Sequence, residues 1–194
     1  MPTYMGEEEV IKKNMALAQE QIYNVEYMEA LPEDVRAELI DGRLYYMAAP
    51  TRTHQRLVMF LSGNIWNYIK EKNCGCQVYP APLALYLDED GYTYLEPDLM
   101  VVCDNSKMDE KGCHGAPDLI AEIVSPSTRS RDYLLKLNKY RSAGVREYWI
   151  LDMEKDVILI YDFEHEKVFS YGWEDKVGSI GFEDLVIDFS GFAR

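Results

Sequence analysis

The chain has 194 residues, of which 47% are hydrophobic and 12% aromatic, and this composition excludes a disordered or fibrous protein. A formal net charge of −14 at pH 7 argues against general electrostatic affinity for DNA, because duplex DNA repels such a surface. The apolar runs are too short to span a membrane, so we expect no membrane partner and no secretory signal in the first residues.

The first quarter of the chain is predicted to form a helical extension followed by a hairpin. We expect one domain over residues 1–194, with the helical extension at about residues 1–24. A further helix is predicted to start at Leu31–Val35, where a proline stands in the first turn. Asp41-Gly42 then separates two short apolar runs, which indicates a β-hairpin.

The rest of the chain alternates helical and strand patterns. Thr53 can cap a helix whose apolar residues recur at helical spacing to about Lys70, and Ser127 or Thr128 can cap a second helix that Gly144 ends. The order is helix, three strands, helix, strand, which predicts an α/β fold with an αβββαβ core, a mixed sheet and extra N- and C-terminal strands. Strands are predicted over residues 77–79, 83–86, 99–103, 119–124, 148–151, 157–163, 168–173 and 185–189.

The cysteines are too few for a disulfide scaffold in a chain of this size. We expect them to be reduced thiols, which favours a cytoplasmic location. A zinc site is an alternative with weak support from the spacing. The cysteines are Cys74, Cys76, Cys103 and Cys113, and the alternative zinc ligands are Cys74, Cys76, Cys113 and His114.

Two apolar runs of strand character each carry one carboxylate, Asp98 at the start of the first and Glu122 within the second. A charge in such a run is expensive to bury unless something pairs with it. The two runs therefore suggest neighbouring strands that share one cation. Carboxylate oxygens suit Mg²⁺ or Mn²⁺, which can polarise a phosphate and help to deprotonate an attacking water. The pattern predicts a divalent-metal site for cutting phosphodiester bonds and calls for no organic cofactor.

The residues around these carboxylates resemble a nuclease pattern over about residues 25–190. In order, the combination is similar to the PD-(D/E)XK nuclease superfamily and, within it, to the Uma-two restriction-endonuclease family. The resemblance implies a restriction-endonuclease-like fold and metal-dependent hydrolysis of DNA. It is carried by Glu38, Asp41-Gly42, His54, Pro97-Asp98, Glu122, Ser125-Pro126-Ser127-Thr128, Arg131-Asp132, Lys136, Tyr140, Gly144-Val145 and Glu147-Tyr148-Trp149.

One position departs from the superfamily pattern, which has a lysine two residues after the glutamate where this chain has Val124. The resemblance implies that the lysine is supplied from the following helix, and Lys136 matches its position. Lys139 lies three residues on, along a different line of the helix. We therefore expect Asp98 and Glu122 to bind the metal and Lys136 to assist the water and the phosphate.

Glu38 and His54 are expected to complete the surroundings of the site. For Glu38 the alternative is a structural or surface carboxylate, and for His54 a capping or packing histidine. Asp118 also follows a proline and lies four residues before Glu122, so it competes for the role of metal ligand. Asp98 is preferred because its strand precedes the strand that carries the glutamate.

A basic segment offers a route to DNA despite the acidic net charge. Residues 126–146 contain six basic residues and one acid, so they could form a positive strip beside the carboxylates, or simply a solvated helix face. DNA is the expected substrate, and a homodimer would let two sites meet two strands. The rival prediction is a non-catalytic binding or assembly module, which Val124 and the net charge favour. The six bases are Arg129, Arg131, Lys136, Lys139, Arg141 and Arg146.

Overall fold

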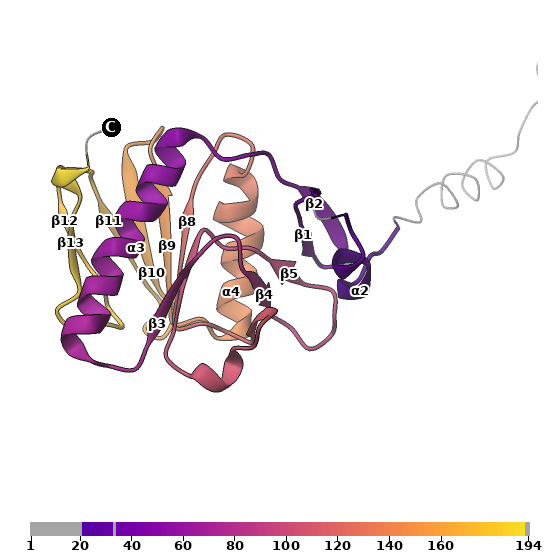
Figure 1. The fold of residues 1–194 in the computed structure, drawn as a ribbon. Coiled ribbons are helices and arrows are strands. Elements are labelled where there is room, and N and C mark those ends of the chain that lie inside the picture. Colours follow the sequence, from indigo (N-terminus) through magenta and orange to yellow (C-terminus); the bar gives the residue numbers. More distant parts are fainter. Residues whose placement is uncertain (1–20, 33, 193–194) are drawn as a thin grey trace, which may run out of the picture.

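Apolar strands form a central six-stranded sheet in the computed structural model, which describes residues 21–32 and 34–192 (Figure 1). The strand order is β11-β10-β9-β8-β6-β3, with β8 and β9 parallel and every other pair antiparallel. The fold class predicted from the sequence is confirmed, and the predicted hairpin over residues 157–173 is formed by β10 and β11. The strands are β3 (Gln77–Pro80), β6 (Leu99–Val102), β8 (Leu119–Ile123), β9 (Glu147–Asp152), β10 (Val157–Asp162) and β11 (Lys167–Tyr171).

Helices pack against this sheet. The long helix α3 (Arg52–Lys72) is capped two residues earlier than expected, by Thr51, whose side chain accepts a hydrogen bond from His54 N. The second helix is not regular throughout: a π-helical segment, η2 (Arg131–Lys136), precedes α4 (Leu137–Ala143). Among the described helices, none combines the length and apolar character that crossing a bilayer demands.

The alternation of side chains along β6 and β8 separates two cores. Residues at odd positions pack with α3, whereas residues at even positions pack with α4. Position 122 is in phase with the even set, and the Glu122 side chain is accordingly contacted from the α4 side, by Lys136 and Tyr140. The odd set is Leu99, Val101, Leu119, Ala121 and Ile123, and the even set is Met100, Val102, Ile120 and Val124.

A smaller sheet lies beside the α4 face, with strand order β2-β1-β5-β4-β7. The predicted hairpin is confirmed in β1 and β2, and Asp41 and Gly42 at its turn have φ values of 50° and 76°. Such left-handed angles are those a two-residue hairpin turn requires. Residues of this sheet share the core with α4. The strands are β1 (Ala37–Ile40), β2 (Arg43–Tyr46), β4 (Ala84–Tyr86), β5 (Tyr94–Leu95) and β7 (Gly112–His114), and the short helix η1 (Asn105–Lys107) precedes β7.

One expectation for the start of the chain is corrected, whereas the last predicted strand is present. The helix near the start is α2 (Val25–Glu29), capped by Asn24, and not a helix starting at Leu31–Val35. The last predicted strand is β13 (Val186–Asp188), which pairs with β12 (Lys176–Gly178) in a separate two-stranded sheet before the turn η3 (Phe189–Gly191). The expected helical extension of residues 1–24 falls almost entirely outside the described residues.

The buried carboxylate of Glu147 anchors the segment that leads to β13. It accepts hydrogen bonds from Trp149 Nε1 at 2.7 Å, Ser179 Oγ at 2.6 Å and Gly181 N at 2.9 Å. These donors replace the water that the carboxylate loses on burial. Glu147 therefore holds the fold together on the α3 side of the sheet, away from the α4 side.

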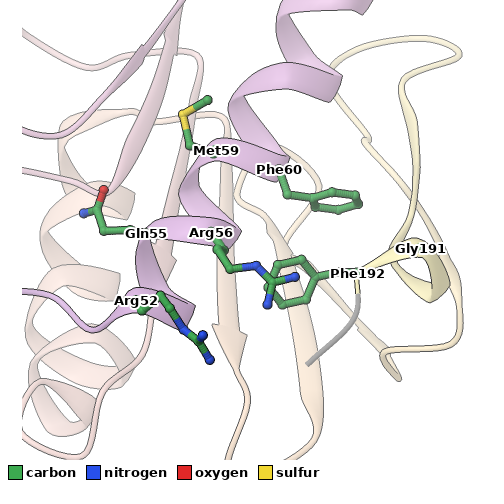
Figure 2. A pocket seen from close by; sticks show the side chains of 7 residues that line it. All are labelled: Arg52, Gln55, Arg56, Met59, Phe60, Gly191 and Phe192. Atoms are coloured by element: carbon green, nitrogen blue, oxygen red, sulfur yellow. The ribbon is translucent and has the colours of Figure 1, made fainter.

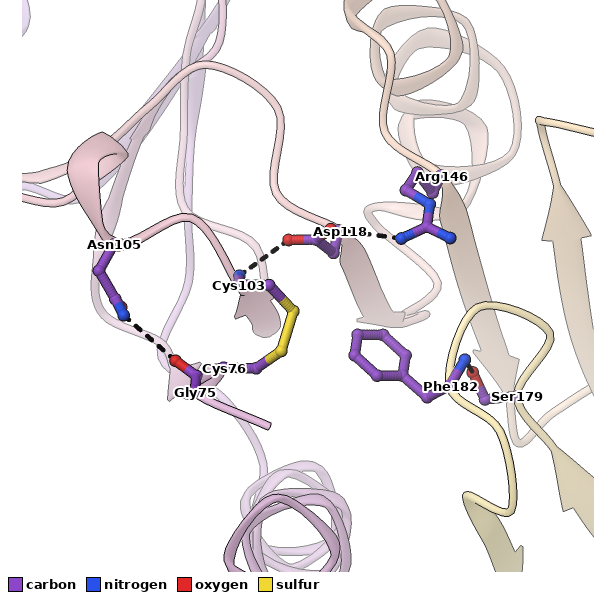
Figure 3. Close-up of a disulfide and its surroundings, with 8 residues drawn as sticks. All are labelled: Gly75, Cys76, Cys103, Asn105, Asp118, Arg146, Ser179 and Phe182. Carbon is purple, nitrogen blue, oxygen red and sulfur yellow. Dashed lines mark hydrogen bonds and ion pairs between the residues drawn. A yellow bond between two sulfur atoms is a disulfide. The ribbon is translucent and has the colours of Figure 1, made fainter. Parts of the chain in front are cut away.

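A disulfide joins Cys76 and Cys103 across the antiparallel strands β3 and β6 (Figure 3). The register pairs Gln77 with Val102, so the two cysteines face each other one residue beyond the ladder. The expectation of reduced thiols is wrong for this pair, and the alternative zinc set loses Cys76. Because persistent disulfides are rare in the cytoplasm, the bond removes one reason for expecting a cytoplasmic location, which stays a prediction.

Thiol labelling should distinguish the cysteines. Cys74 is exposed and Cys113 is buried, so alkylation of the native protein should modify Cys74 alone. Denaturation without reductant should make Cys113 reactive as well, and reduction should make Cys76 and Cys103 reactive. Mass spectrometry counts the alkyl groups added at each step. Reduction is also expected to lower the free energy of unfolding by about 3 kcal/mol, because the bond closes a loop between residues 27 positions apart. Labelling of all four thiols before reduction would contradict the pairing.

Candidate active site

Asp98 and Glu122 are neighbours across two antiparallel strands. The register of β6 and β8 pairs Leu99 with Ala121, and one further step brings Asp98 opposite Glu122. Side chains opposed in this way have Cβ atoms about 4.5–5.5 Å apart. A hydrogen bond from Ile123 N to Asp98 Oδ2, at 2.8 Å, ties the two strands together at this point. Asp98 and Glu122 are thus neighbours across the two strands, at the end of β6 where Asp98 precedes the strand.

Lys136 meets Glu122 from the π-helical segment. Its Nζ lies 2.8 Å from Glu122 Oε1, and the hydroxyl of Tyr140 donates to the same oxygen at 2.7 Å. The side chains of Lys136 and Glu122 are only 4% and 5% exposed, so this ion pair is shielded from solvent. Tyr140 lies four residues after Lys136, on the same side of the helix. Val124, where the superfamily pattern has lysine, is buried in the apolar core behind the pair.

Glu38 reaches the same ammonium from the smaller sheet. Glu38 Oε1 lies 2.7 Å from Lys136 Nζ, and Glu38 Oε2 lies 3.5 Å from Arg131 NH1. Glu96 N donates to Glu38 Oε1 at 3.3 Å, and the Glu38 side chain is 1% exposed. Glu38 is therefore not the surface carboxylate of the alternative interpretation, and Lys136 joins the two sheets through it.

His54 contacts Asp98 from the first turn of α3. Its Nε2 lies 3.1 Å from Asp98 Oδ2, and its other ring nitrogen, Nδ1, is buried without a hydrogen-bond partner among the described residues. If Nε2 carries the proton, it donates to the carboxylate and fixes the rotamer of Asp98. The imidazole thus lies beside the acidic pair rather than capping its own helix, which Thr51 does.

Asp132 belongs to the cluster as well; the sequence includes it in the pattern of the resemblance but does not assign it to the site. Its side chain is 2% exposed, and its Oδ1 lies 3.7 Å from Lys136 Nζ without a hydrogen-bond partner in the described part of the chain. The Tyr148 hydroxyl donates to the backbone oxygen of Asp132 at 3.0 Å. The one available signal is spacing: Asp132 and Tyr140 stand four residues before and after Lys136.

The electrostatics of the cluster favour protonated groups. Burial raises the pKa of Glu122 well above its ordinary value; Lys136 opposes this, and Asp98, Asp132 and Glu38 add to it. Burial likewise raises the pKa of Asp132. For Lys136 burial acts to lower the pKa, but the surrounding carboxylates, Glu122 foremost, outweigh burial and raise it. If all four carboxyl groups were ionised, they would carry more negative charge than the cations of the cluster neutralise, so protonation of Glu122 and Asp132 relieves the excess.

The charge and the donor atoms fit a divalent cation. In the described ranges, no three His, Cys, Asp or Glu side chains form a ready-made group for a metal. However, Asp98 Oδ1 and Glu122 Oε2 have no hydrogen-bond partner among the described residues, and carboxylate oxygens are the ligands that Mg²⁺ and Mn²⁺ prefer. The carboxyl groups are Glu38, Asp98, Glu122 and Asp132, and the permanent cations are Lys136 and Arg131.

Two competing candidates lie outside the cluster. Asp118 accepts a hydrogen bond from Cys103 N at 2.8 Å and lies 3.6 Å from Arg146 NH1, at the end of β8 remote from Glu122 (Figure 3). Lys139 forms ion pairs with Asp41 and Asp88 on the hairpin side. Both residues thus have partners of their own.

The basic segment of residues 126–146 is not a free positive strip. Five of its six bases contact a carboxylate, and the sixth, Arg141, lies over the ring of Phe163. Paired charges present little net field to a DNA backbone. The pairs are Arg129 with Asp152 and Glu154, Arg131 with Glu38, Lys136 with Glu38 and Glu122, Lys139 with Asp41 and Asp88, and Arg146 with Asp118 and Glu164.

Comparisons with known proteins agree with this architecture. Residues 25–177 match the Uma2 family, described as "Putative restriction endonuclease". A similar solved structure is described as a "putative nuclease belonging to DUF820" from Anabaena variabilis. It shares 17% identity with this chain at a TM-score of 0.71, and the match covers 87% of this chain and 96% of that one. A search of the curated proteins finds no match. Because the family match spans most of the chain, the protein belongs to the Uma2 family and has its restriction-endonuclease-like fold.

Proposed function

We propose that the protein is a metal-dependent endonuclease that hydrolyses DNA phosphodiester bonds with water as the nucleophile. The observation that carries the proposal is the cross-strand pair of Asp98 and Glu122, with the ammonium of Lys136 at 2.8 Å from Glu122. Membership of a family described in terms of restriction endonucleases supports the same reaction class.

Asp98 and Glu122 would hold Mg²⁺ or Mn²⁺ through the oxygens that have no other partner among the described residues, Asp98 Oδ1 and Glu122 Oε2. When bound, such an ion supplies a Lewis acid that polarises a phosphate oxygen and lowers the pKa of water. It would also neutralise the surplus carboxylate charge, which otherwise repels a phosphate.

Lys136 acts as a fixed cation in this proposal. The surrounding carboxylates raise its pKa, so it keeps its proton at neutral pH. A permanent ammonium cannot take a proton from water, but it can stabilise the negative charge that develops on the phosphoryl oxygens. Glu38 and His54 are positioning residues: Glu38 holds the Lys136 ammonium and His54 holds the Asp98 carboxylate.

The test combines calorimetry with a cleavage assay on the wild-type protein. Titration with Mn²⁺ should show saturable binding, and supercoiled plasmid should be nicked in Mn²⁺ or Mg²⁺ and left intact when EDTA removes the metal. Sedimentation measures whether two copies associate, as cutting both strands would favour. Absence of both binding and nicking would overturn the proposal.

One observation favours a second function, that of a non-catalytic binding or assembly module. Lys136 Nζ lies between Glu38 and Glu122, at 2.7 Å and 2.8 Å, and so already offers both carboxylates a positive partner. A protein that needs no metal to satisfy these groups would show weak Mn²⁺ binding and no nicking. The same two measurements therefore distinguish the two functions.

A further inference from the structure

A shallow cavity of about 500 Å³ lies over the first turns of α3, where the end of the described chain packs against the helix (Figure 2). Its floor is aromatic: the rings of Phe60 and Phe192 lie 5.5 Å apart, centroid to centroid. Its rim is polar and cationic. The lining residues are Arg52, Gln55, Arg56, Met59, Phe60, Gly191 and Phe192.

Arg52 and Arg56 differ from most of the bases in residues 126–146. Neither contacts a carboxylate among the described residues, whereas the bases of residues 126–146 are mostly paired. Both side chains are exposed and lie four residues apart, hence on the same face of the helix. The guanidinium of Arg56 lies 5.3 Å from the centroid of the Phe192 ring, which positions it while leaving its N–H donors available (Figure 2).

The same turns of α3 connect this surface to the candidate active site. His54, between the two arginines in sequence, points to the opposite face of the helix and contacts Asp98 at 3.1 Å. A helix with its side chains is about 10–12 Å across, and DNA rises about 3.4 Å per base pair. A strand whose phosphate lay at Asp98 could therefore present a phosphate a few nucleotides away, at most, to Arg52 and Arg56.

We propose that Arg52, Arg56 and Gln55 form a surface that binds the phosphate backbone of DNA beside the bond to be cleaved. The inference rests on the proposed nuclease function and names the part of the protein that holds its substrate. The guanidinium fork matches the oxygens of a phosphate, and the Gln55 amide adds a further donor. Because the protein has a net charge of −14, a local positive charge would be needed to hold the DNA backbone next to the acidic site.

The experiment compares the double variant Arg52→Ala/Arg56→Ala with the wild type. Binding of a labelled duplex and of a labelled single strand is measured by fluorescence anisotropy in Ca²⁺ over a series of salt concentrations. Removal of two phosphate contacts should reduce the salt slope of log K for the duplex by about 2 and weaken binding by about tenfold or more at low salt. Arg52→Lys/Arg56→Lys keeps the charge and should retain most of the affinity.

Lys70→Ala is the matched control. Lys70 is exposed, lies on the same helix about 21 Å further along, and lacks a carboxylate partner in the described residues. Its replacement removes the same kind of charge outside the cavity and should leave the affinity and the salt slope unchanged. Thermal melting should show that all variants fold like the wild type, because the replaced side chains are exposed.

Two outcomes would overturn the inference. The first is that Arg52→Ala/Arg56→Ala binds DNA with the affinity and salt slope of the wild type. If the wild type nicks plasmid in that case, the nuclease proposal holds and only the proposed binding surface is wrong. The second is a change from dimer to monomer in sedimentation of that variant, which would assign the surface to a second copy of the chain. Conversely, arginine-dependent binding without Mn²⁺ binding or nicking would support the surface and contradict the nuclease.

Discussion

Asp98→Asn and Glu122→Gln are each expected to abolish metal-dependent nicking and to weaken Mn²⁺ binding by more than about 100-fold. Each change replaces one carboxylate of the cross-strand pair with a neutral amide of the same shape, so charge and oxygen ligands are lost with little change in packing. In the Asp98→Asn variant, the amide oxygen can still accept the bond that Ile123 N donates. Calorimetric titration with Mn²⁺ and a plasmid nicking assay measure the two effects.

Asp118→Asn provides the matched control for these variants. Asp118 also follows a proline, but its carboxylate is bonded to Cys103 N at the remote end of β8. Its replacement should leave metal binding and nicking as they are in the wild type. If nicking persists in both Asp98→Asn and Glu122→Gln, the assignment of the acidic pair as the metal site is wrong.

Lys136→Met should lower the free energy of unfolding by about 3–5 kcal/mol as well as remove activity. Methionine fills the volume of the side chain, but Glu38 and Glu122 are left buried without their shared cation. Chemical denaturation measures the loss. Lys139→Met is the control, since its ion pairs with Asp41 and Asp88 are partly exposed and should contribute no more than about 1 kcal/mol.

The stability deficit of Lys136→Met should also depend on pH. Burial raises the pKa of Glu122 in the folded state, and loss of Lys136 removes the group that opposes this rise. A carboxyl group with a raised folded-state pKa stabilises the fold fully below its unfolded pKa, and this contribution is lost as pH rises through the folded value. The deficit relative to wild type should therefore shrink as the pH is lowered from neutral toward the ordinary pKa of a glutamate, about 4. A deficit that stays constant over this range would show that Glu122 is not left charged and unpaired.

Local patterns were sufficient for the elements that carry the acidic pair. The apolar alternation around Leu99–Val102 and Leu119–Ile123 defines two strands, and it also fixes which face Glu122 takes. The long helix and the hairpin at Asp41-Gly42 are likewise set by residues close in sequence. These features could be predicted because periodicity and turn chemistry act over a few residues.

Features that depend on distant pairing could not be predicted in the same way. The disulfide follows from the register of β3 on β6, and the neutralised basic segment follows from acids on other elements, such as Asp152 and Glu38. The π-helical segment η2 breaks the regular helical spacing that was expected before Lys136, so the burial of Asp132 was not apparent. For the disulfide and the basic segment, the decisive partner lies far away in sequence, where local patterns carry no information.

The contact of Lys136 with both Glu38 and Glu122 makes the candidate active site a joint between two sheets. Glu38 belongs to the smaller sheet and Glu122 to the central one, so each sheet alone carries an incomplete site. Separating the two sheets would leave the buried Lys136 ammonium with only one of these two carboxylates. The ion pairs that hold the sheets together therefore also hold the side chains of the site in position. Mutations between the two sheets, away from the phosphodiester bond, are thus able to disable the site while both sheets remain folded.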